Sequence, residues 1–179
     1  MTYSEVKPIG WTKRAITEMA EKLATAWGIE PKNTLDSLAA RLGGSVAYQD
    51  MLSVDQTNDG SILIDDIRNF RIFVPDYVSF ERNRFTIAHE VGPYVLHYVA
   101  QRLGGRKIKA ARASGPNQQR AEREADWFAA GLLMPQALFL EEYLKSEGNL
   151  TSVARHFGVS VQAAKWQLDY LNVNAAPKA

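Results

Sequence analysis

Apolar residues in the first part of the chain recur at helical spacing. Between residues 12 and 27 they occupy positions 15, 16, 19, 20, 23, 24 and 27, which predicts an amphipathic helix that ends at Gly28. A shorter helix is predicted over residues 34–44, with Thr34 or Asp36 near its N-cap and two glycines at its end. From Arg82 onward the helical pattern returns and continues to the end of the chain.

Between these helical regions the pattern changes to short β-type runs. They cover residues 45–49, 61–64 and 70–74, and the turn-rich sequence DQTNDG separates the first run from the second. In the run FRIFV, Phe70, Ile72 and Val74 alternate with the other two residues, as in a half-buried strand. The pattern therefore predicts an α+β fold in which a small antiparallel sheet packs on several helices.

The C-terminal block, residues 149–171, has the spacing of a helix-turn-helix. Its first helix is predicted to end near Phe157, with Gly158 in the turn and Ser160 as the N-cap of the second helix. We interpret it as a helical closure of the domain formed by residues 12–145. Residues 172–179 are predicted to form a flexible tail.

Direct DNA reading is the alternative for this block. Its second helix offers Gln162, Lys165 and Gln167 as donors, but it has one positive charge, which Asp169 offsets. The positions 161, 164, 166, 168 and 171 together make a face suited to packing. A structural role is the prediction, and direct nucleic-acid binding is not expected.

Composition narrows the function classes further. With 46% hydrophobic and 23% charged residues the chain is predicted to be globular, and its net charge of +1 gives no global attraction to nucleic acid or membranes. The absence of cysteine excludes disulfides, thiolate zinc sites and thiol nucleophiles. The first 30 residues contain no apolar run typical of a signal peptide, and no run is long enough to span a bilayer. We expect a cytoplasmic protein.

Residues 102–120 form the most loop-like segment. They include Arg102, Arg106, Lys107, Lys109 and Arg112, with no acidic residue among them. This segment is either a basic patch for an acidic partner or a solvated loop between two helices, and the second interpretation is favoured.

The sequence FTIAHEVGPYVLHY, residues 85–98, carries the most informative chemistry. A helix reading His-Glu-x-x-His places two imidazoles one turn apart, where they share a zinc ion, with the glutamate as general base for a metal-bound water. His89 and Glu90 match the first half of this motif, but Pro93 stands where the second histidine is required. The motif therefore lacks one metal ligand.

A second set of acidic residues follows in the helix predicted at 118–134. Glu122 and Asp126 are four residues apart and therefore share one helical face, while Glu124 points away from both. In zinc peptidases with a glutamate ligand, such a helix supplies the third ligand, and an acid one turn later orients a ligand histidine. We predict Glu122 as that ligand and Asp126 as the partner of His89. The alternative is that residues 122–124 form a solvated face.

Three blocks resemble the ImmA/IrrE family of metallo-endopeptidases. They are RFTIAHEVG at residues 84–92, LHY at 96–98 and EREADWFAAGLLMP at 122–135. The resemblance implies a gluzincin-like zinc peptidase with a small sheet packed on helices. It also implies that the partner is a repressor or antitoxin of the Xre helix-turn-helix type.

Carried over by position, the resemblance implies His89 as a zinc ligand, Glu90 as the general base and Glu122 as the third protein ligand. The chain departs from the family at Pro93, and again at Asn83, where an aspartate is expected. Because two protein ligands leave a zinc site incomplete, we predict weak or absent zinc binding and impaired peptidase activity. Proline inside a helix also costs about 3 kcal/mol, so we expect a kink at this turn.

His97 is not expected to replace the missing ligand. It lies eight residues after His89, roughly 12 Å along a regular helix and about 80° around it. We interpret His97 as a helix residue near the core with local hydrogen-bond partners. Candidates for stabilising an oxyanion are Tyr94 and Tyr98.

Three functions follow in order of preference. The first is an ImmA/IrrE-type peptidase with impaired catalysis, in which any remaining activity would use Glu90 as base and the strand FRIFV to align a peptide by edge pairing. The second is a non-catalytic module that binds a repressor or antitoxin. The third is a DNA-binding regulator.

Overall fold

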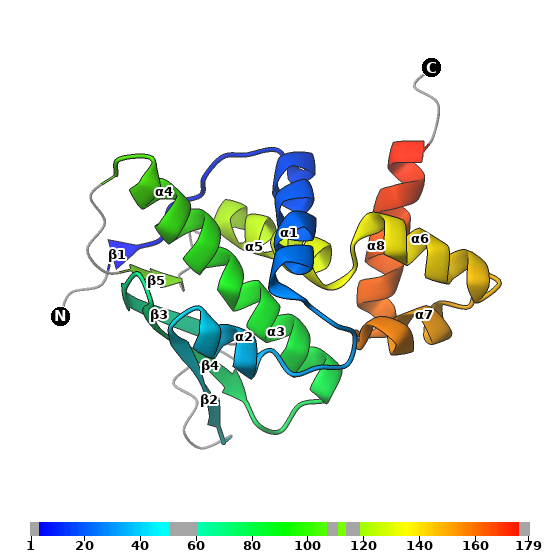
Figure 1. The fold of residues 1–179 in the computed structure, drawn as a ribbon, viewed down its shortest axis with the longest axis horizontal. Coiled ribbons are helices and arrows are strands. Elements are labelled where there is room, and N and C mark those ends of the chain that lie inside the picture. The colour runs from blue at the N-terminus through cyan, green and yellow to red at the C-terminus, as the bar shows by residue number, and fades with distance from the viewer. Residues whose placement is uncertain (1–3, 51–60, 107–110, 114–118, 176–179) are drawn as a thin grey trace.

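The structure, a computed structural model, describes residues 4–50, 61–106, 111–113 and 119–175. Within these ranges the chain forms a small sheet and several helices, so the predicted α+β class is confirmed. In Figure 1 the sheet lies on one side and the C-terminal helices on the other, and a long helix runs between them.

The helices follow the predicted pattern closely in the first part of the chain. For α1, the Thr12 hydroxyl accepts from the Ala15 N–H and Gly28 ends the helix with φ 60°. The N-cap of α2 is Leu35, between the two residues predicted for it. The helices are α1 (Lys13–Trp27), α2 (Asp36–Arg41), α3 (Phe80–Gly92), the π-helical η1 (Pro93–Val99), α4 (Ala100–Leu103), α5 (Gln119–Leu133), α6 (Gln136–Lys145), α7 (Leu150–Phe157) and α8 (Val161–Ala175).

The sheet has five strands in the order β1-β5-β3-β4-β2. These are β1 (Ser4–Glu5), β2 (Gly44–Gln49), β3 (Ser61–Asp66), β4 (Asn69–Pro75) and β5 (Ala111–Ala113). β3 pairs antiparallel with β4 and β5, whereas β2 with β4 and β1 with β5 are parallel, so the sheet is mixed rather than purely antiparallel. β5 lies inside the segment that the sequence predicts as a loop, because three residues carry too little pattern to reveal a strand.

The position of β4 overturns one prediction. β4 contains the run FRIFV and was expected to align a peptide by edge pairing. It is hydrogen-bonded on one side to β3 and on the other to β2, so neither of its edges is open. Added strands need an unpaired edge. Among the described strands, β2 borders the sheet along six residues and β1 along two.

α3 occupies the middle layer of the molecule. One side of it contacts β4, and the other side contacts α5, which in turn lies against α1. The α1–α5 approach depends on small residues, because a Cβ added at Gly131 would lie 2.9 Å from the Thr17 carbonyl oxygen and 3.1 Å from the Ala20 Cβ. This close packing fixes α5 against the rest of the domain. It thereby sets where the acidic residues of α5 point.

The C-terminal pair α7 and α8 has the predicted turn. Gly158 ends α7 with φ 61°, and the Ser160 hydroxyl accepts from the Ala163 N–H at 3.1 Å. The predicted packing face of α8 is wrong at two of its positions. Its expected packing face includes Val161 and Trp166, but these side chains are 46% and 60% exposed. Gln167, considered as a DNA donor, is buried and donates to the Met134 carbonyl at 2.9 Å.

Several predicted features fall partly outside the described residues. These are the turn at residues 55–60, the basic residues Lys107 and Lys109, and the end of the tail at 176–179. α8 continues to Ala175, into the segment predicted as a tail. In the part of the chain that the structure describes, no helix combines the length and apolarity needed to cross a membrane.

Candidate functional site

A single long helical run carries the motif residues. The Ser79 hydroxyl caps α3 by accepting from the Arg82 N–H, and η1 and α4 follow α3 without a break. Pro93 has no N–H to donate within a helix. The chain passes this point as a π-helical segment, in which the Ala100 N–H donates to the Val95 carbonyl. The expected distortion at Pro93 is thus a change of helix type, and the helix continues beyond it.

The structure brings together the three residues singled out around the metal position. His89 lies opposite α5, with Nδ1 2.9 Å from Asp126 Oδ1 and Nε2 3.1 Å from Glu122 Oε2. The two acids come from adjacent turns of α5, as their spacing predicts. Although burial lowers the pKa of His89, its hydrogen bonds to Asp126 and Glu122 outweigh this effect and raise the pKa to about 10. In this arrangement the imidazolium donates from both ring nitrogens.

Glu90 lies on the other side of the same turn and is 4% exposed. Its Oε2 has no hydrogen-bond partner among the described residues. Burial raises the pKa of Glu90 to about 7, with the His89 charge opposing the shift and Glu122 adding to it. A buried carboxyl with a pKa near neutral has the property that a general base requires. Glu90 has this property, and its role as a general base stays a prediction.

The donor set around His89 does not complete a catalytic zinc site. Such sites use three protein ligands and keep one position open. His89 and Glu122 supply two, and the third position is the apolar ring of Pro93. Across the described residues, no group of three or more His, Cys, Asp or Glu side chains is arranged to hold a metal ion. Glu122 Oε2 lies 3.1 Å from His89 Nε2, a separation that two ligands of one metal ion also have, so these two residues fit the two remaining ligand positions.

His97 has a local partner and does not join this set. It is 1% exposed, and its Nε2 lies 2.9 Å from Glu124 Oε2. Its Nδ1 has no partner among the described residues. An i→i+5 turn contains more residues than an α-helical turn, so η1 rotates His97 back toward α5. This contact agrees with the interpretation of His97 as a core residue with a local partner.

Glu124 is the residue that the sequence did not identify. It does point away from Glu122 and Asp126, but the proposed solvated face is wrong for it because its side chain is fully buried. Its two oxygens accept from the backbone N–H groups of Ile9 and Gly10, at 2.9 and 3.0 Å, and from Arg120 Nε at 2.9 Å, beside the His97 contact. Although burial raises the pKa of Glu124, these bonds lower it to about 2.

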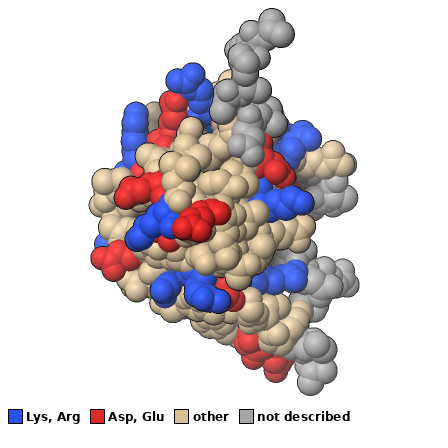
Figure 2. All heavy atoms as spheres, turned by 90° about the vertical axis from the view of Figure 1, so that its right-hand side faces the viewer, with Lys and Arg blue, Asp and Glu red and all other residues tan. Residues whose placement is uncertain are grey.

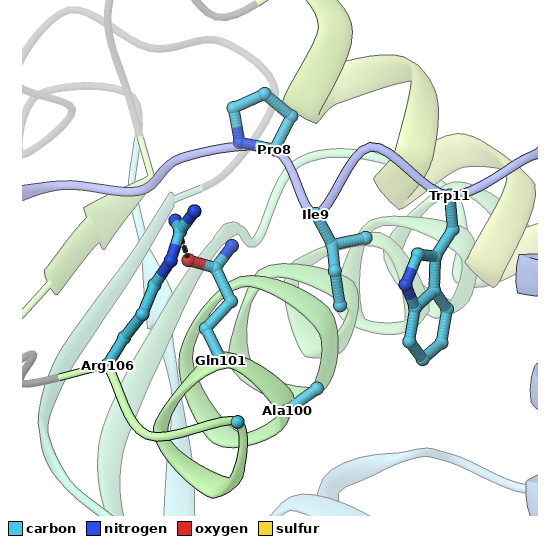
Figure 3. A pocket seen from close by; sticks show the side chains of 7 residues that line it. Pro8, Ile9, Trp11, Ala100, Gln101 and Arg106 are labelled. Atoms are coloured by element: carbon cyan, nitrogen blue, oxygen red, sulfur yellow. Dashed lines mark hydrogen bonds between the residues drawn. The ribbon is translucent and has the colours of Figure 1, made fainter.

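Residues 7–11 form a strap that is fixed across the helices. Besides the two bonds to Glu124, the Lys7 carbonyl accepts from Gln101 Nε2 and the Trp11 carbonyl accepts from Arg120 Nη2, both at 2.6 Å. A pocket of about 250 Å³ lies between the strap and α4, with Arg106 hydrogen-bonded to Gln101 at one end and Trp11 at the other (Figure 3). The strap therefore couples the start of the chain to the helix that carries Glu122.

The two tyrosines considered for oxyanion stabilisation have other partners. The Tyr94 hydroxyl accepts from the Arg68 N–H at 3.1 Å, and its ring stacks on Phe70 with centroids 4.3 Å apart. The Tyr98 hydroxyl accepts from Arg102 Nη1 at 2.8 Å. Both hydroxyls are thus engaged in contacts with the sheet side or the end of the helix, and the structure does not place them at His89.

The stability of the protein is expected to fall as the pH rises from about 6.5 to 10. The pKa of His89 is about 10 in the folded chain, against an ordinary value of 6.5. Below pH 6.5 the ring is protonated in both states and its stabilisation is complete. As the pH rises through the folded pKa that stabilisation is lost, at no more than about 1.4 kcal/mol per pH unit. Urea unfolding midpoints measured across this range test the slope.

The variant His89→Gln provides the control. In this variant the free energy of unfolding should depend little on pH above pH 7. Below pH 7 it should still fall as the pH rises. The remaining part comes from Glu90, whose pKa of about 7 exceeds its ordinary 4.5, so its ionisation costs stability between those values. An unchanged slope above pH 7 in His89→Gln would show that the ion pairs of His89 do not stabilise the fold.

Comparison with known proteins identifies the family. Residues 48–169 match the family model described as the IrrE N-terminal-like domain, of the peptidase M78 class. The chain belongs to the IrrE N-terminal-like family. The match covers more than half of the sequence and includes α3, η1 and α5. Search of the curated proteins gave no match.

A solved structure is similar to this IrrE-like chain. It is described as a Mycobacterium tuberculosis transcriptional regulator, and the two agree with a TM-score of 0.62 at 18% sequence identity. The match covers 92% of this chain and 48% of that one. At this identity the likeness shows the fold alone. The IrrE-like chain thus spans about half the length of that regulator.

Proposed function

We propose that this IrrE-like chain acts on a repressor or antitoxin of the Xre helix-turn-helix type and that its peptidase activity is impaired or absent. The family is one of zinc-peptidase-like regulators. The impaired or absent peptidase activity is inferred from the set of metal ligands around His89. Pro93 stands where the family has its second histidine ligand, so His89 and Glu122 are the two protein ligands that remain.

Four residues of this chain occupy positions that have a role in the family. His89 and Glu122 are the two remaining ligand positions, Asp126 orients His89 through Nδ1, and Glu90 is the general-base position. In the family, zinc supplies an activated water and polarises the scissile carbonyl. Because the donor set here is incomplete, we derive no hydrolytic step for this chain. We expect weak zinc binding or none.

A non-catalytic binding module is the second candidate, and the same observation favours it. The buried contact between His97 and Glu124 joins η1 to α5 and does not use the residues of the metal position. A scaffold that is stable in this way retains its surface for a partner even when catalysis is lost. The two candidates differ only in whether any cleavage remains.

Direct DNA binding has little support. Gln167 is buried in the protein, so it offers no donor to a base edge. Figure 2 shows the side of the molecule that carries the C-terminal helices, and there basic and acidic side chains are interspersed with uncharged surface. A DNA-binding face concentrates positive charge instead.

A direct test combines binding and cleavage of one partner. We would mix the purified chain with a purified Xre-type helix-turn-helix repressor, follow complex formation by calorimetry and follow cleavage by intact-protein mass. The expected result is a complex in which the repressor stays intact. Rapid cleavage at catalytic amounts of the chain would show that its activity is not impaired. The absence of a complex would remove the repressor from the proposal.

A further inference from the structure

A groove of about 500 Å³ lies far along α3 from His89, between the first turn of α3 and the turn that joins α7 to α8. Two apolar side chains border it, Phe80 of α3 and Val161 of α8, which are 41% and 46% exposed. Exposed apolar side chains that line a concave surface mark a contact site for another molecule more often than scattered ones do.

The floor of the groove covers a buried positive charge. Gly158 lines the groove, and a Cβ added to it would lie 3.4 Å from Arg84 Nη1. Arg84 is 2% exposed and donates to the backbone carbonyls of Glu30, Asn33 and Phe157, at 2.8, 2.8 and 2.5 Å. These contacts use three of its five N–H donors, and because carbonyl groups are neutral they leave its charge unbalanced. The positive charge therefore lies directly beneath the groove.

Among the described residues, the hydrogen bonds of Arg84 all go to backbone carbonyls and none goes to a carboxylate. Burial lowers the pKa of Arg84 to about 10, which still leaves the side chain charged at neutral pH. Because protein rather than water surrounds this charge, the charge is only weakly screened from a group in the groove. An acidic group that enters the groove would face the positive charge of Arg84 across Gly158.

The rim of the groove adds further positive charge. Lys32 and Arg155 line it and are exposed. One acidic residue, Glu81, belongs to the lining; it lies in the first turn of α3, where it complements the helix dipole. The cations therefore outnumber the acid around this groove, although the whole chain has a net charge of only +1.

The backbone at Lys32 supports a role for its side chain. Its φ is 70°, in the left-handed region that costs free energy for residues other than glycine. Its backbone N lies 3.2 Å from the position of a Cβ at Gly158, so this loop is packed against the turn. Glycine would relieve the strain at this position, whereas the lysine adds a cation to the lining of the groove.

We propose that this groove docks a partner segment in which acidic side chains alternate with bulky apolar ones. The acidic groups pair with Lys32 and Arg155 above the buried Arg84, and the apolar groups pack on Phe80 and Val161. The apolar rim and Glu81 disfavour a nucleic-acid backbone, which presents phosphates without apolar side chains. This inference does not depend on zinc, or on the partner being a repressor.

The test measures binding of a fluorescein-labelled peptide of alternating glutamate and leucine by anisotropy. Lys32→Gly and Arg155→Gln each remove one cation, and the first also relieves the strained φ, so both variants should fold. We expect each to weaken binding about threefold to fivefold, and the double variant about tenfold or more. Lys22→Gln is the matched control because Lys22 is exposed on α1 and does not line the groove.

Three further probes distinguish the chemistry of the occupant. A lysine–leucine peptide should bind far less than the glutamate–leucine peptide, a serine–leucine peptide should bind weakly, and added salt should weaken the acidic peptide. Equal binding of acidic and basic peptides would overturn the proposal. So would acidic-peptide binding that Lys32→Gly and Arg155→Gln leave unchanged. A DNA duplex that binds more tightly than the peptide, with the same sensitivity to these variants, would assign the groove to nucleic acid instead.

Discussion

Replacing Glu124 by alanine is expected to lower the free energy of unfolding by about 3–5 kcal/mol, the range found when one partner of a buried ion pair is removed. The substitution leaves His97, Arg120 and the N–H groups of Ile9 and Gly10 without their acceptor. Each is then either buried and unpaired or must reach water by local opening. For a domain of this size the loss corresponds to a melting temperature lower by roughly 6–20 °C.

Amide hydrogen exchange localises the effect of Glu124→Ala. If Glu124 fixes the strap, the amides of Ile9 and Gly10 should exchange much faster in the variant, while those of α7 and α8 should change less. Glu18→Ala is the control, since it removes an exposed ion pair with Arg14 and should leave the melting temperature unchanged. Unchanged protection of Ile9 and Gly10 in Glu124→Ala would mean that the strap is held by other contacts.

The variant Pro93→His is expected to convert the chain from weak or absent zinc binding to about one zinc per chain. The backbone at residue 93 already has helical dihedral angles, φ −53° and ψ −39°, which a histidine adopts without strain. Its imidazole would lie one turn from His89 and opposite Glu122, which completes the three ligands of a catalytic site. Zinc at 100 times its dissociation constant should then stabilise the fold by about 2.7 kcal/mol.

Pro93→Ala separates metal binding from repair of the helix. It restores the backbone N–H and removes the ring, but it adds no ligand. Elemental analysis of protein purified without chelator should find zinc in Pro93→His and little in Pro93→Ala or the native chain. Stoichiometric zinc in the native chain would contradict our account of Pro93, because another group would then complete the site. A metal-free Pro93→His would show that the site has lost more than one ligand.

The site residues that the sequence predicts are those whose relation is local. His89 and Glu90 are adjacent, and Glu122 and Asp126 are four residues apart, so a helical period is enough to place each pair on its face. That the two pairs meet was inferred from the resemblance to a family, and the structure does bring His89 against both acids. The absence of a ligand at Pro93 could be read directly from the motif.

The hydrogen bonds that surround the Glu124 carboxylate show what reasoning from local spacing misses. Ile9 and Glu124 are 115 residues apart, and no local pattern links a backbone N–H near the start of the chain to one acid among three in α5. The helical period indicated that Glu124 turns away from Glu122, but not whether water or protein lies on that side. The answer depends on how α1, η1 and the strap enclose α5.

The sequence by itself determined the extent of α1, the strands β2, β3 and β4, the α+β class and the incomplete metal motif, because these depend on spacing within a few turns of chain. Only the tertiary structure decided the order of the strands, the closed edges of β4, the burial of Glu124 and Gln167, and the exposure of Trp166. Those features depend on which surfaces meet. Such contacts join residues far apart in the chain, where hydrophobic periodicity carries no information.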